Sequence, residues 1–217
     1  MKDPITLFHY WRSSSSVRVR WALAIKGLQF ESVHLDLLSG EHQDAAHAAR
    51  SPLGYVPALR IGNHLISESV AICELLDDLV PSPPLRPADP YARARMRQLV
   101  EIVNAGTQPL QNLTAMRRVS PSVDEQRVWA RHWITRGLAA FEAALHACRK
   151  EGHTGAYCVG DQLSLADLFL VPQLYNARRF DVDLAAFPLS LQVEANAITS
   201  DSYREARAEA WQPAAAR

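Results

Sequence analysis

Four consecutive serines, at positions 13–16, stand between Arg12 and Arg18 in this 217-residue chain. An apolar segment at 5–8 predicts a strand before them, and apolar residues at helical spacing predict a helix after them that ends near Gly27. In an open α/β sheet such a turn lies beyond the carboxyl end of a strand, where ligands bind. Serine hydroxyls and the free N–H groups of a helix N-terminus would converge there on an anion. The structural alternative is a serine-rich helix cap flanked by solvated arginines.

The residues around this run favour holding an anion over making a serine nucleophile. A serine nucleophile needs a neighbouring base, and the arginines here stay protonated. Lowering the pKa of a bound thiol from about 8.5 by two units takes about 2.7 kcal/mol. A hydrogen bond to a charged acceptor contributes roughly 1.5–3 kcal/mol and a helix N-terminus about 0.3–1 kcal/mol. One serine hydroxyl at the start of a helix therefore suffices to hold a thiolate.

Two further segments could bind a ligand. Val56-Pro57 opens a predicted strand, and a cis bond there would leave the Val56 backbone open to a peptide-like ligand, although trans is the commoner form. Glu68-Ser69 precedes a predicted helix at 70–79, which Ser67 or Ser69 could cap. The Ser69 hydroxyl and the N–H groups of that helix start could take a carboxylate, and Glu68 could take an ammonium group. An ordinary helix cap is the alternative.

The elements that must position these residues follow the order β-α-β-α-β-β-α. Strand signals lie at 5–8, 30–35, 56–61 and 64–66, with a two-residue hairpin turn at Gly62-Asn63, and helical signals lie at 17–26, 43–50 and 70–79. This order predicts a mixed sheet with helices on it. Beyond a proline-rich stretch only helical spacing remains. We expect an α/β domain at 1–82, a linker at 83–90 and an all-helical domain at 91–217.

Composition excludes several classes of protein. The 23 basic and 23 acidic side chains give no net charge, which argues against a nucleic-acid binder. No apolar run approaches the roughly 18 residues of a membrane span, and residues 1–5 lack the apolar core of a signal peptide. Cys73, Cys148 and Cys158 form no CxxC pair, which favours a cytoplasmic location and buried, inert thiols. His42 and His47 would lie on different helix faces, so we expect no metal.

Together these pieces resemble the glutathione transferases, specifically the zeta class, over nearly the whole chain. The stretches that carry the resemblance are YWRSS at 10–14, VRVR at 17–20, VPAL at 56–59, ESVAI at 68–72, QPLQNL at 108–113, YCVGD at 157–161, ADL at 166–168, LVPQ at 170–173 and RFDVDL at 179–184. The resemblance implies a thioredoxin-like first domain, the helical second domain of that family, glutathione as cofactor and a homodimer.

The resemblance also implies a set of site residues. Ser13, Ser14 and Ser15 would be the catalytic hydroxyls. Glutathione would be bound by Ser13, Ser14, Ser15, Ser16, Val17, Arg18, His42, Val56, Pro57, Glu68, Ser69, Gln108, Asn112, Leu113 and Thr114. Pro57 would be cis, with Val56 pairing to the cysteinyl backbone and Glu68 and Ser69 holding the γ-glutamyl end. Arg12, Arg18 and Arg179 would bind substrate carboxylates.

This sequence departs from the zeta pattern at three places. The pattern at the active site is Ser-Ser-Cys, and the third residue here is Ser15, which puts any role for a protein thiol in doubt. His42 stands where the family usually has a glutamine, and the neighbouring Gln43 could replace it. The usual Asn-Pro pair is Ser51-Pro52.

The activity implied by the resemblance is glutathione-dependent cis–trans isomerisation of a maleyl diketo acid, maleylacetoacetate or maleylpyruvate, in aromatic catabolism. The thiolate held by Ser13 and Ser14 would add to the double bond, rotation would follow, and elimination would regenerate glutathione. Two alternatives stay open. One is a transferase or dehalogenase that consumes glutathione on α-halo acids or other electrophiles. The other is a non-catalytic glutathione-binding or partner-binding module.

Overall fold

The computed structural model describes residues 3–153 and 155–214. Within them the chain divides into two units. Unit 1 comprises the residues up to Pro84 together with those from Ser200 onward, and unit 2 comprises Leu85–Thr199. This division groups the residues from Ser200 onward with the α/β unit, whereas the sequence led us to expect one helical domain over 91–217.

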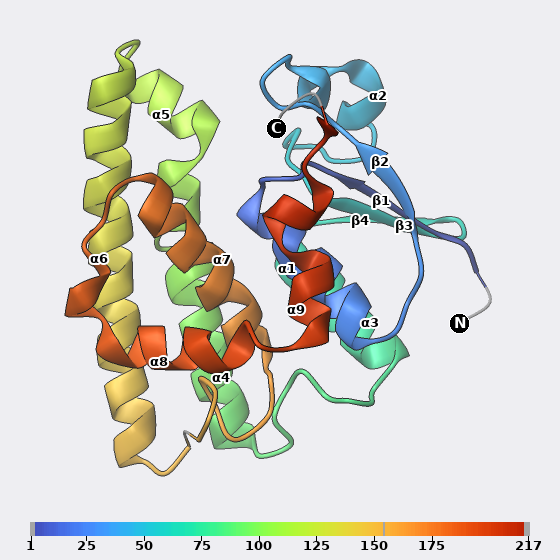
Figure 1. Ribbon diagram of the computed structural model, residues 1–217. Coiled ribbons are helices and arrows are strands. Elements are labelled where there is room, and N and C mark those ends of the chain that lie inside the picture. The colour runs from blue at the N-terminus through green and yellow to red at the C-terminus, as the bar shows by residue number, and fades with distance from the viewer. Residues whose placement is uncertain (1–2, 154, 215–217) are drawn as a thin grey trace. The chain divides into compact units, whose positions relative to one another are not determined.

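Unit 1 has the predicted order of strands and helices. Its elements are β1 (Ile5–His9), α1 (Ser14–Ile25), β2 (Glu31–His34), η1 (Glu41–Gln43), α2 (Ala45–Ala48), β3 (Ala58–Ile61), β4 (His64–Ser67), α3 (Ser69–Leu79), α9 (Asp201–Ala206) and η4 (Ala208–Trp211). The sheet order is β2-β1-β3-β4; β1 and β2 are parallel, and β3 runs antiparallel to both of its neighbours. Helix α1 packs against both α3 and α9 (Figure 1).

Helix α1 has a clear signal at each end. Ser13 is the N-cap, and its hydroxyl accepts a hydrogen bond from the Ser16 N–H at 3.3 Å. At the other end Gly27 adopts φ of 63°, and the Leu28 N–H donates to the Leu23 carbonyl at 3.0 Å. This is the six-to-one hydrogen bond of a Schellman ending, which needs a left-handed residue such as glycine. The predicted helix and its end are confirmed.

The predicted helix at 43–50 is shorter than expected. A 3₁₀ turn covers Glu41–Gln43, and α2 covers only Ala45–Ala48. Asp44 separates them with an extended backbone, ψ of 148°. Aspartate favours this conformation at a helix start, so it ends one turn and begins the next.

Unit 2 is helical, as predicted. Its elements are α4 (Pro90–Asn104), η2 (Gln108–Gln111), α5 (Leu113–Val119), α6 (Val123–Lys150), α7 (Leu165–Arg179), η3 (Leu184–Ala186) and α8 (Pro188–Ala197). The predicted capping box opens α7, where the Asp167 carboxylate accepts from the Ser164 N–H and hydroxyl, both at 2.8 Å. Residues 165–174 of α7 are all buried, so this helix forms the centre of the unit. No described helix is long and apolar enough to cross a bilayer.

The C-terminal residues join unit 1 because α9 packs on α1 through specific contacts. The fully buried Trp21 indole donates to the Ser202 hydroxyl at 3.0 Å, and its ring lies 4.9 Å from that of Tyr203. The Arg20 Nε donates to the Ala206 carbonyl at 2.9 Å. Sequence spacing alone could not show these contacts, because they join residues more than 180 positions apart along the chain.

Candidate functional site

The sheet register brings three of the predicted binding segments to one end of the sheet. Phe8 of β1 pairs with Ala58 of β3, and Ala58 pairs with Ser67 of β4. Because neighbouring strands here run antiparallel, the residues after β1, before β3 and after β4 all lie at this end. These residues are the serine run, Val56-Pro57 and Glu68-Ser69.

Two of the four serine hydroxyls accept backbone hydrogen bonds within the turn, and the hydroxyls of the other two have no described partner. Ser13 caps α1, and the buried Ser16 hydroxyl accepts from the Tyr10 N–H at 3.4 Å. Ser14 and Ser15 are 6% and 7% exposed, and within the described chain neither hydroxyl has a hydrogen-bond partner. Their N–H groups belong to the first turn of α1, which has no acceptor within the helix. Hydroxyl and backbone donors therefore stand together at the positive end of a 12-residue helix.

The Val56–Pro57 peptide bond is cis, as the resemblance implies. Val56 lies just before β3, and neither its N–H nor its carbonyl bonds to another residue in the described ranges. An extended peptide could therefore pair with this backbone. A second cis bond, Ser82–Pro83, is one that the sequence did not predict.

Glu68 and Ser69 start α3 without a side-chain cap. The N-cap is Glu68, with φ of 73°, so the expectation that Ser67 or Ser69 caps this helix is wrong. Ser69 is instead the first helical residue, and its hydroxyl accepts from Arg18 Nη1 at 3.1 Å. The first N–H groups of α3 thus remain available to a carboxylate.

Arg18 is completely buried, and it lies behind Ser69. This burial argues against the expected direct contact with a substrate carboxylate. Its hydrogen bond joins α1 to α3 and fixes the Ser69 hydroxyl. Val17, also buried, donates its N–H to the Ser13 carbonyl as part of the helix.

Arg12 directly precedes the serine run, whereas His42 lies in the separate 3₁₀ turn η1 of unit 1. Arg12 is partly exposed, with its guanidinium 5.3 Å from the centre of the Trp11 ring, and no described carboxylate forms an ion pair with it. His42 lies in η1 beside the exposed Gln43.

In unit 2 the segment 108–114 is fixed by contacts with α6 and α7, one of them buried and one half-buried. Gln108 begins η2, Asn112 precedes α5, and Leu113 and Thr114 are its first residues. The Gln111 and Gln173 side chains exchange hydrogen bonds of 2.7 and 3.1 Å, and the Trp129 indole donates to the Leu110 carbonyl at 2.7 Å. These contacts hold the segment against α6 and α7.

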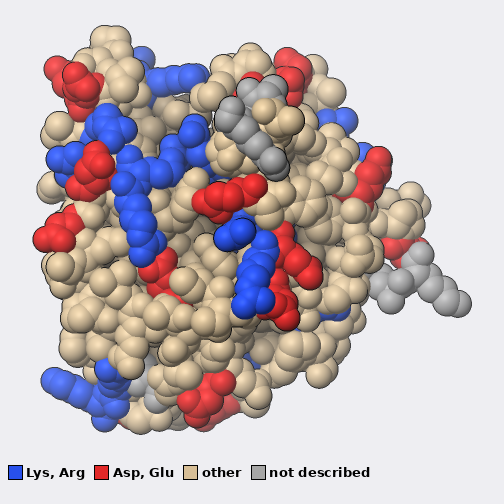
Figure 2. All heavy atoms as spheres, in the orientation of Figure 1, with Lys and Arg blue, Asp and Glu red and all other residues tan. Residues whose placement is uncertain are grey.

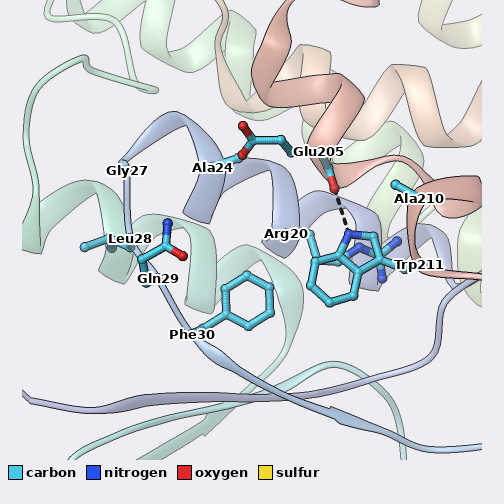
Figure 3. A pocket seen from close by; sticks show the side chains of 9 residues that line it. All are labelled: Arg20, Ala24, Gly27, Leu28, Gln29, Phe30, Glu205, Ala210 and Trp211. Atoms are coloured by element: carbon cyan, nitrogen blue, oxygen red, sulfur yellow. Dashed lines mark hydrogen bonds between the residues drawn. The ribbon is translucent and has the colours of Figure 1, made fainter.

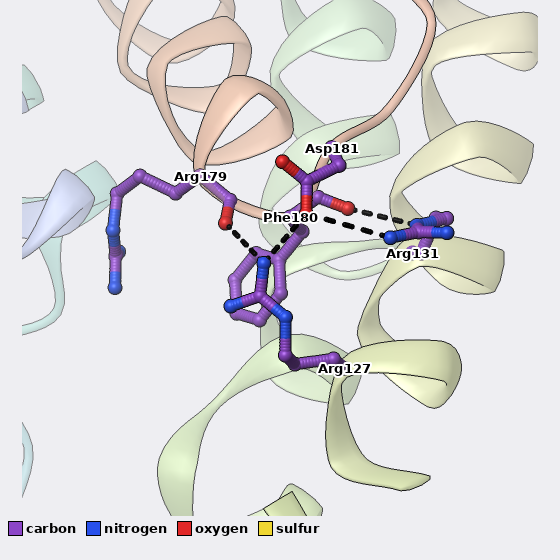
Figure 4. Close-up of polar contacts among 5 residues, drawn as sticks. All are labelled: Arg127, Arg131, Arg179, Phe180 and Asp181. Carbon is purple, nitrogen blue, oxygen red and sulfur yellow. Dashed lines mark hydrogen bonds and ion pairs between the residues drawn. The ribbon is translucent and has the colours of Figure 1, made fainter. Parts of the chain in front are cut away.

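Arg179 ends α7, next to a cluster of charged residues that sequence reasoning missed (Figure 4). Its Nη1 donates to Asn176 at 3.1 Å. Asp181, with φ of 54°, pairs with Arg127 at 2.6 Å and Arg131 at 3.5 Å.

Arg127 and Arg131 also bond to the end of α7. They donate to the carbonyls of Arg179 and Phe180 respectively, at 3.2 and 2.9 Å. Figure 4 shows Arg179 extending away from the Asp181 carboxylate. The four-residue spacing of Arg127 and Arg131 on one helix face is the signal that could have indicated them.

The basic side chains of this region are visible at the surface. On the face drawn in Figure 2, Lys and Arg gather over the N-terminal part of α6 and the end of α7, with acidic side chains among them. Among residues 3–153 and 155–214, no group of three or more His, Cys, Asp or Glu side chains is placed to hold a metal ion.

Burial shifts the pKa of several groups in unit 1. Burial, aided by the Arg20 charge, lowers the pKa of His9 to about 3, and burial lowers the pKa of Arg20 to about 9. Burial also raises the pKa of Cys73 to about 12. All three cysteines are free and buried, which agrees with the expectation of inert thiols.

Comparisons with known proteins agree with this geometry. Residues 3–78 match the family model "Glutathione S-transferase, N-terminal domain", and residues 131–208 match "Glutathione S-transferase, C-terminal domain". The chain is 42% identical to probable maleylacetoacetate isomerase 2 of Drosophila melanogaster, covering 92% of this chain and 86% of that protein. It is 40% identical to maleylacetoacetate isomerase of Rhizobium meliloti, covering 98% and 100%.

Two solved structures are also similar. Maleylacetoacetate isomerase from Anaeromyxobacter dehalogenans, with glutathione bound in its active site, has a TM-score of 0.86 and 43% identity over 98% of each chain. A bacterial maleyl pyruvate isomerase of the zeta class has a TM-score of 0.91 and 37% identity over 96% of this chain and 99% of the other. The chain therefore belongs to the glutathione S-transferase family. Within that family, its place is the zeta class.

Proposed function

We propose that this protein is a glutathione-dependent cis–trans isomerase of a maleyl diketo acid, either maleylacetoacetate or maleylpyruvate. The observation that carries the proposal is the pair of open serine hydroxyls, Ser14 and Ser15, at the start of α1. In a zeta-class fold this is where a thiolate would be stabilised. Relatives about 40% identical are named maleylacetoacetate isomerase.

The three open segments of unit 1 fit three groups of glutathione: its thiolate, its cysteinyl backbone and its γ-glutamyl end. The donors of Ser14 and Ser15 suit its thiolate, and the unpaired backbone of Val56 suits its central peptide. The uncapped start of α3 at Ser69 suits its γ-glutamyl carboxylate, and the exposed Glu68 suits its ammonium group. When bound, glutathione supplies a thiolate that can add to and leave an activated double bond.

The serines of this chain keep that sulfur negative. A hydroxyl proton donated to the sulfur contributes roughly 1.5–3 kcal/mol, and the helix N-terminus adds about 0.3–1 kcal/mol. Ser13 can still donate its proton, because its bond to the Ser16 N–H uses only a lone pair. Ser13, Ser14 and Ser15 are thus the proposed donors to the sulfur, and Ser15 occupies the position of the family cysteine.

Arginine side chains are the proposed partners of the substrate carboxylates. Arg12 has no described carboxylate partner, and the Asn176 side chain orients Arg179. A guanidinium fork matches a carboxylate better than an ammonium group does. The proposal gives Arg18 an indirect role, since it reaches Ser69 and not the surface.

The remaining expected contacts are part of the same proposal. Ser16 and Val17 shape the turn, and His42 or Gln43 contacts glutathione from the η1 segment. Unit 2 contributes the segment at 108–114, with Gln108, Asn112, Leu113 and Thr114. We also propose a homodimer, since two-fold dimers are the commonest assembly, and a cytoplasmic location, which the free thiols favour.

The test follows substrate and free thiol together. Purified protein is incubated with glutathione and each maleyl diketo acid, while the conjugated chromophore and the free thiol are measured. We expect the fumaryl product with no loss of thiol. Ser14→Ala should slow the reaction about tenfold or more, because one donor to the sulfur is lost. Ser39→Ala, an exposed serine of the same unit, is the matched control.

Two outcomes would contradict the proposal. Consumption of one thiol per substrate would make the protein a transferase or dehalogenase. A bound thiol with an unshifted pKa, together with no turnover of either acid, would make it a binding module.

A further inference from the structure

Arg20 is a buried cation whose hydrogen bonds go to uncharged groups. The residue is 1% exposed, and its Nη2 donates to the Trp11 carbonyl at 2.9 Å. Its Nη1 lies 2.9 Å from His9 Nδ1 and 3.4 Å from the Tyr10 carbonyl. Its Nε donates to the Ala206 carbonyl at 2.9 Å. In the described part of the chain no carboxylate forms an ion pair with Arg20, and the charge of Glu209 only partly opposes the lowering of its pKa by burial. The direct contacts of the guanidinium are therefore with these uncharged acceptors.

Two of these acceptors belong to the turn that presents the serines. The Tyr10 carbonyl also accepts from the Ser13 N–H at 3.2 Å, and the Tyr10 N–H donates to the Ser16 hydroxyl. Arg20 therefore fixes the entry to this turn, two or three residues before Ser13. Removing its donors would take away the hydrogen bond to the Trp11 carbonyl and leave the Tyr10 carbonyl with the Ser13 N–H alone, and the turn would have to shift.

The other contacts of Arg20 belong to the C-terminal segment, residues 200–211. The Trp211 ring centre lies 5.5 Å from the guanidinium, and the Trp211 indole donates to the Glu205 carbonyl at 2.7 Å. The same ring lies 5.2 Å from His9 and 5.4 Å from Phe30. Figure 3 shows Trp211 beside Arg20 at the wall of a cavity of about 330 Å³. The segment is thus attached to the guanidinium by a hydrogen bond and an aromatic ring.

His9 fixes the guanidinium from the sheet side. Arginine only donates hydrogen bonds, so His9 Nδ1 is the acceptor and its proton lies on Nε2. That proton points to the Ser32 hydroxyl at 2.8 Å. Neutral His9 therefore orients Arg20 between β1 and the C-terminal segment.

We infer that Arg20 is a positioning residue for the turn that holds glutathione, and that it makes residues 200–211 part of that site. The inference rests on the proposed function, because it assigns the purpose of the turn from it. A displacement of the Ser14 donors by a fraction of an ångström weakens their hold on the sulfur, since hydrogen bonds to a charged acceptor depend steeply on geometry.

The test compares three variants of the full-length protein. Arg20→Met removes every donor, Arg20→Lys restores the charge and one donor group, and Arg136→Met makes the first change at an exposed residue of α6, outside residues 200–211. Glutathione affinity is measured by titration, and the pKa of the bound thiol by its thiolate absorbance against pH. We expect Arg20→Met to weaken glutathione binding about tenfold or more and to raise the thiol pKa. Arg20→Lys should recover part of both, and Arg136→Met should change neither.

A second measurement needs no substitution that threatens folding. Hydrogen exchange of the wild-type protein is followed with and without S-methylglutathione. Coupling between two sites is reciprocal, so the ligand should slow exchange at residues 10–16 and at residues 200–211. Protection of 10–16 alone would overturn the inference, as would wild-type affinity and thiol pKa in Arg20→Met. A wild-type protein that binds no glutathione would overturn the proposed function itself.

Discussion

Ser15 occupies the position of the zeta-class cysteine, and its surroundings show what a hydroxyl can do there. It lies in the first turn of α1, nearly buried, beside the open hydroxyl of Ser14. A hydroxyl at this place donates a hydrogen bond as a thiol does, but it is a far poorer nucleophile. The proposed isomerisation needs the donor and does not need the nucleophile.

Ser15→Cys should therefore change isomerase activity little. We expect kcat/KM to stay within about threefold of wild type, because the donors of Ser14 and the helix start remain. The new thiol sits at a helix N-terminus, so it should be alkylated readily. The measurement is kcat/KM before and after iodoacetamide: wild type should resist, since its cysteines are buried, and the variant should lose activity. A large gain in rate for Ser15→Cys would show that the reaction uses a protein thiol.

His9 makes the stability of unit 1 depend on pH. Burial lowers its pKa to about 3, while an unfolded histidine titrates near 6.5. Between these values the unfolded chain binds a proton that the folded chain does not, so stability falls as the pH drops from about 6.5 toward 3, by up to about 1.4 kcal/mol per pH unit.

His9→Asn should flatten this dependence. The asparagine oxygen can still accept from Arg20, but it does not titrate. Urea unfolding at several pH values between about 7 and 5 would measure the slope. The exposed His64→Asn is the control. If the unfolding free energy depends on pH equally in wild type and in His9→Asn, His9 is not the source of this dependence.

The sequence could indicate the residues that face a ligand but not those that support them. Four adjacent serines before a helix, and a proline opening a strand, carry local signals. Arg20 and His9 carry none, because their roles depend on carbonyls of a turn and of a segment far along the chain. Arg18 was expected to touch ligand, since periodicity cannot tell a buried arginine from an exposed one.

At the scale of elements, α1 and α3 are joined at both ends of their contact. Near the serines the Arg18–Ser69 hydrogen bond connects them. Near the far end of α1 the buried Lys26 ammonium pairs with Asp77 at 2.7 Å, with side chains 0% and 5% exposed. Lys26 also donates to the Pro83 carbonyl. Such a pair fixes the register of two helices, but water no longer solvates its charges.

Replacing one partner of the Lys26–Asp77 pair should lower the free energy of unfolding far more than replacing both partners by apolar residues. Asp77→Asn leaves a buried ammonium without its anion, and we expect a loss of about 3–5 kcal/mol in unfolding free energy. The double variant Lys26→Met with Asp77→Leu should recover most of that loss. Urea unfolding of single and double variants would measure both, with the exposed Glu151→Gln as a control for an ordinary surface pair. Additive losses in the double variant would contradict this account.

Element boundaries were predictable where a residue type dictates them. Gly27, Gly62 and the Ser164–Asp167 box each force a local conformation, and each element ends or begins as predicted. The start of α3 was predicted to within one residue, but its N-cap was not, because Glu68 has a positive φ that glutamate seldom adopts. Tertiary contacts must hold it there.

At the scale of the whole molecule, most of the proposed glutathione-binding groups lie in one unit and Arg179 lies in the other. The groups that fit glutathione's thiolate, peptide and γ-glutamyl end lie in unit 1, and Arg179 lies in unit 2, where Arg127 and Arg131 hold the end of α7. Variants of these glutathione-binding groups and variants of Arg179 should therefore affect different kinetic constants.

Arg179→Leu should raise the KM for the maleyl substrate or lower kcat, and leave glutathione affinity unchanged. Loss of one charged hydrogen bond of roughly 1.5–3 kcal/mol corresponds to a fall in kcat/KM of about tenfold or more. Steady-state kinetics and a glutathione titration would separate the two effects. Arg136→Leu, at an exposed position of α6, is the matched control. Equal loss of glutathione affinity would contradict the role of Arg179.

The return of residues from Ser200 onward to unit 1 has a consequence for how the protein is made. Helix α1 is translated well before residues 202–206, so the Trp21 indole and the Arg20 guanidinium receive these partners only when that later segment has left the ribosome. Unit 1 therefore completes its packing only after the whole of unit 2 has been translated. In ribosome-bound chains stalled before residue 200, we expect the α/β unit to remain readily cleaved by a protease. Protease resistance should appear only in chains stalled after residues 200–211 have emerged.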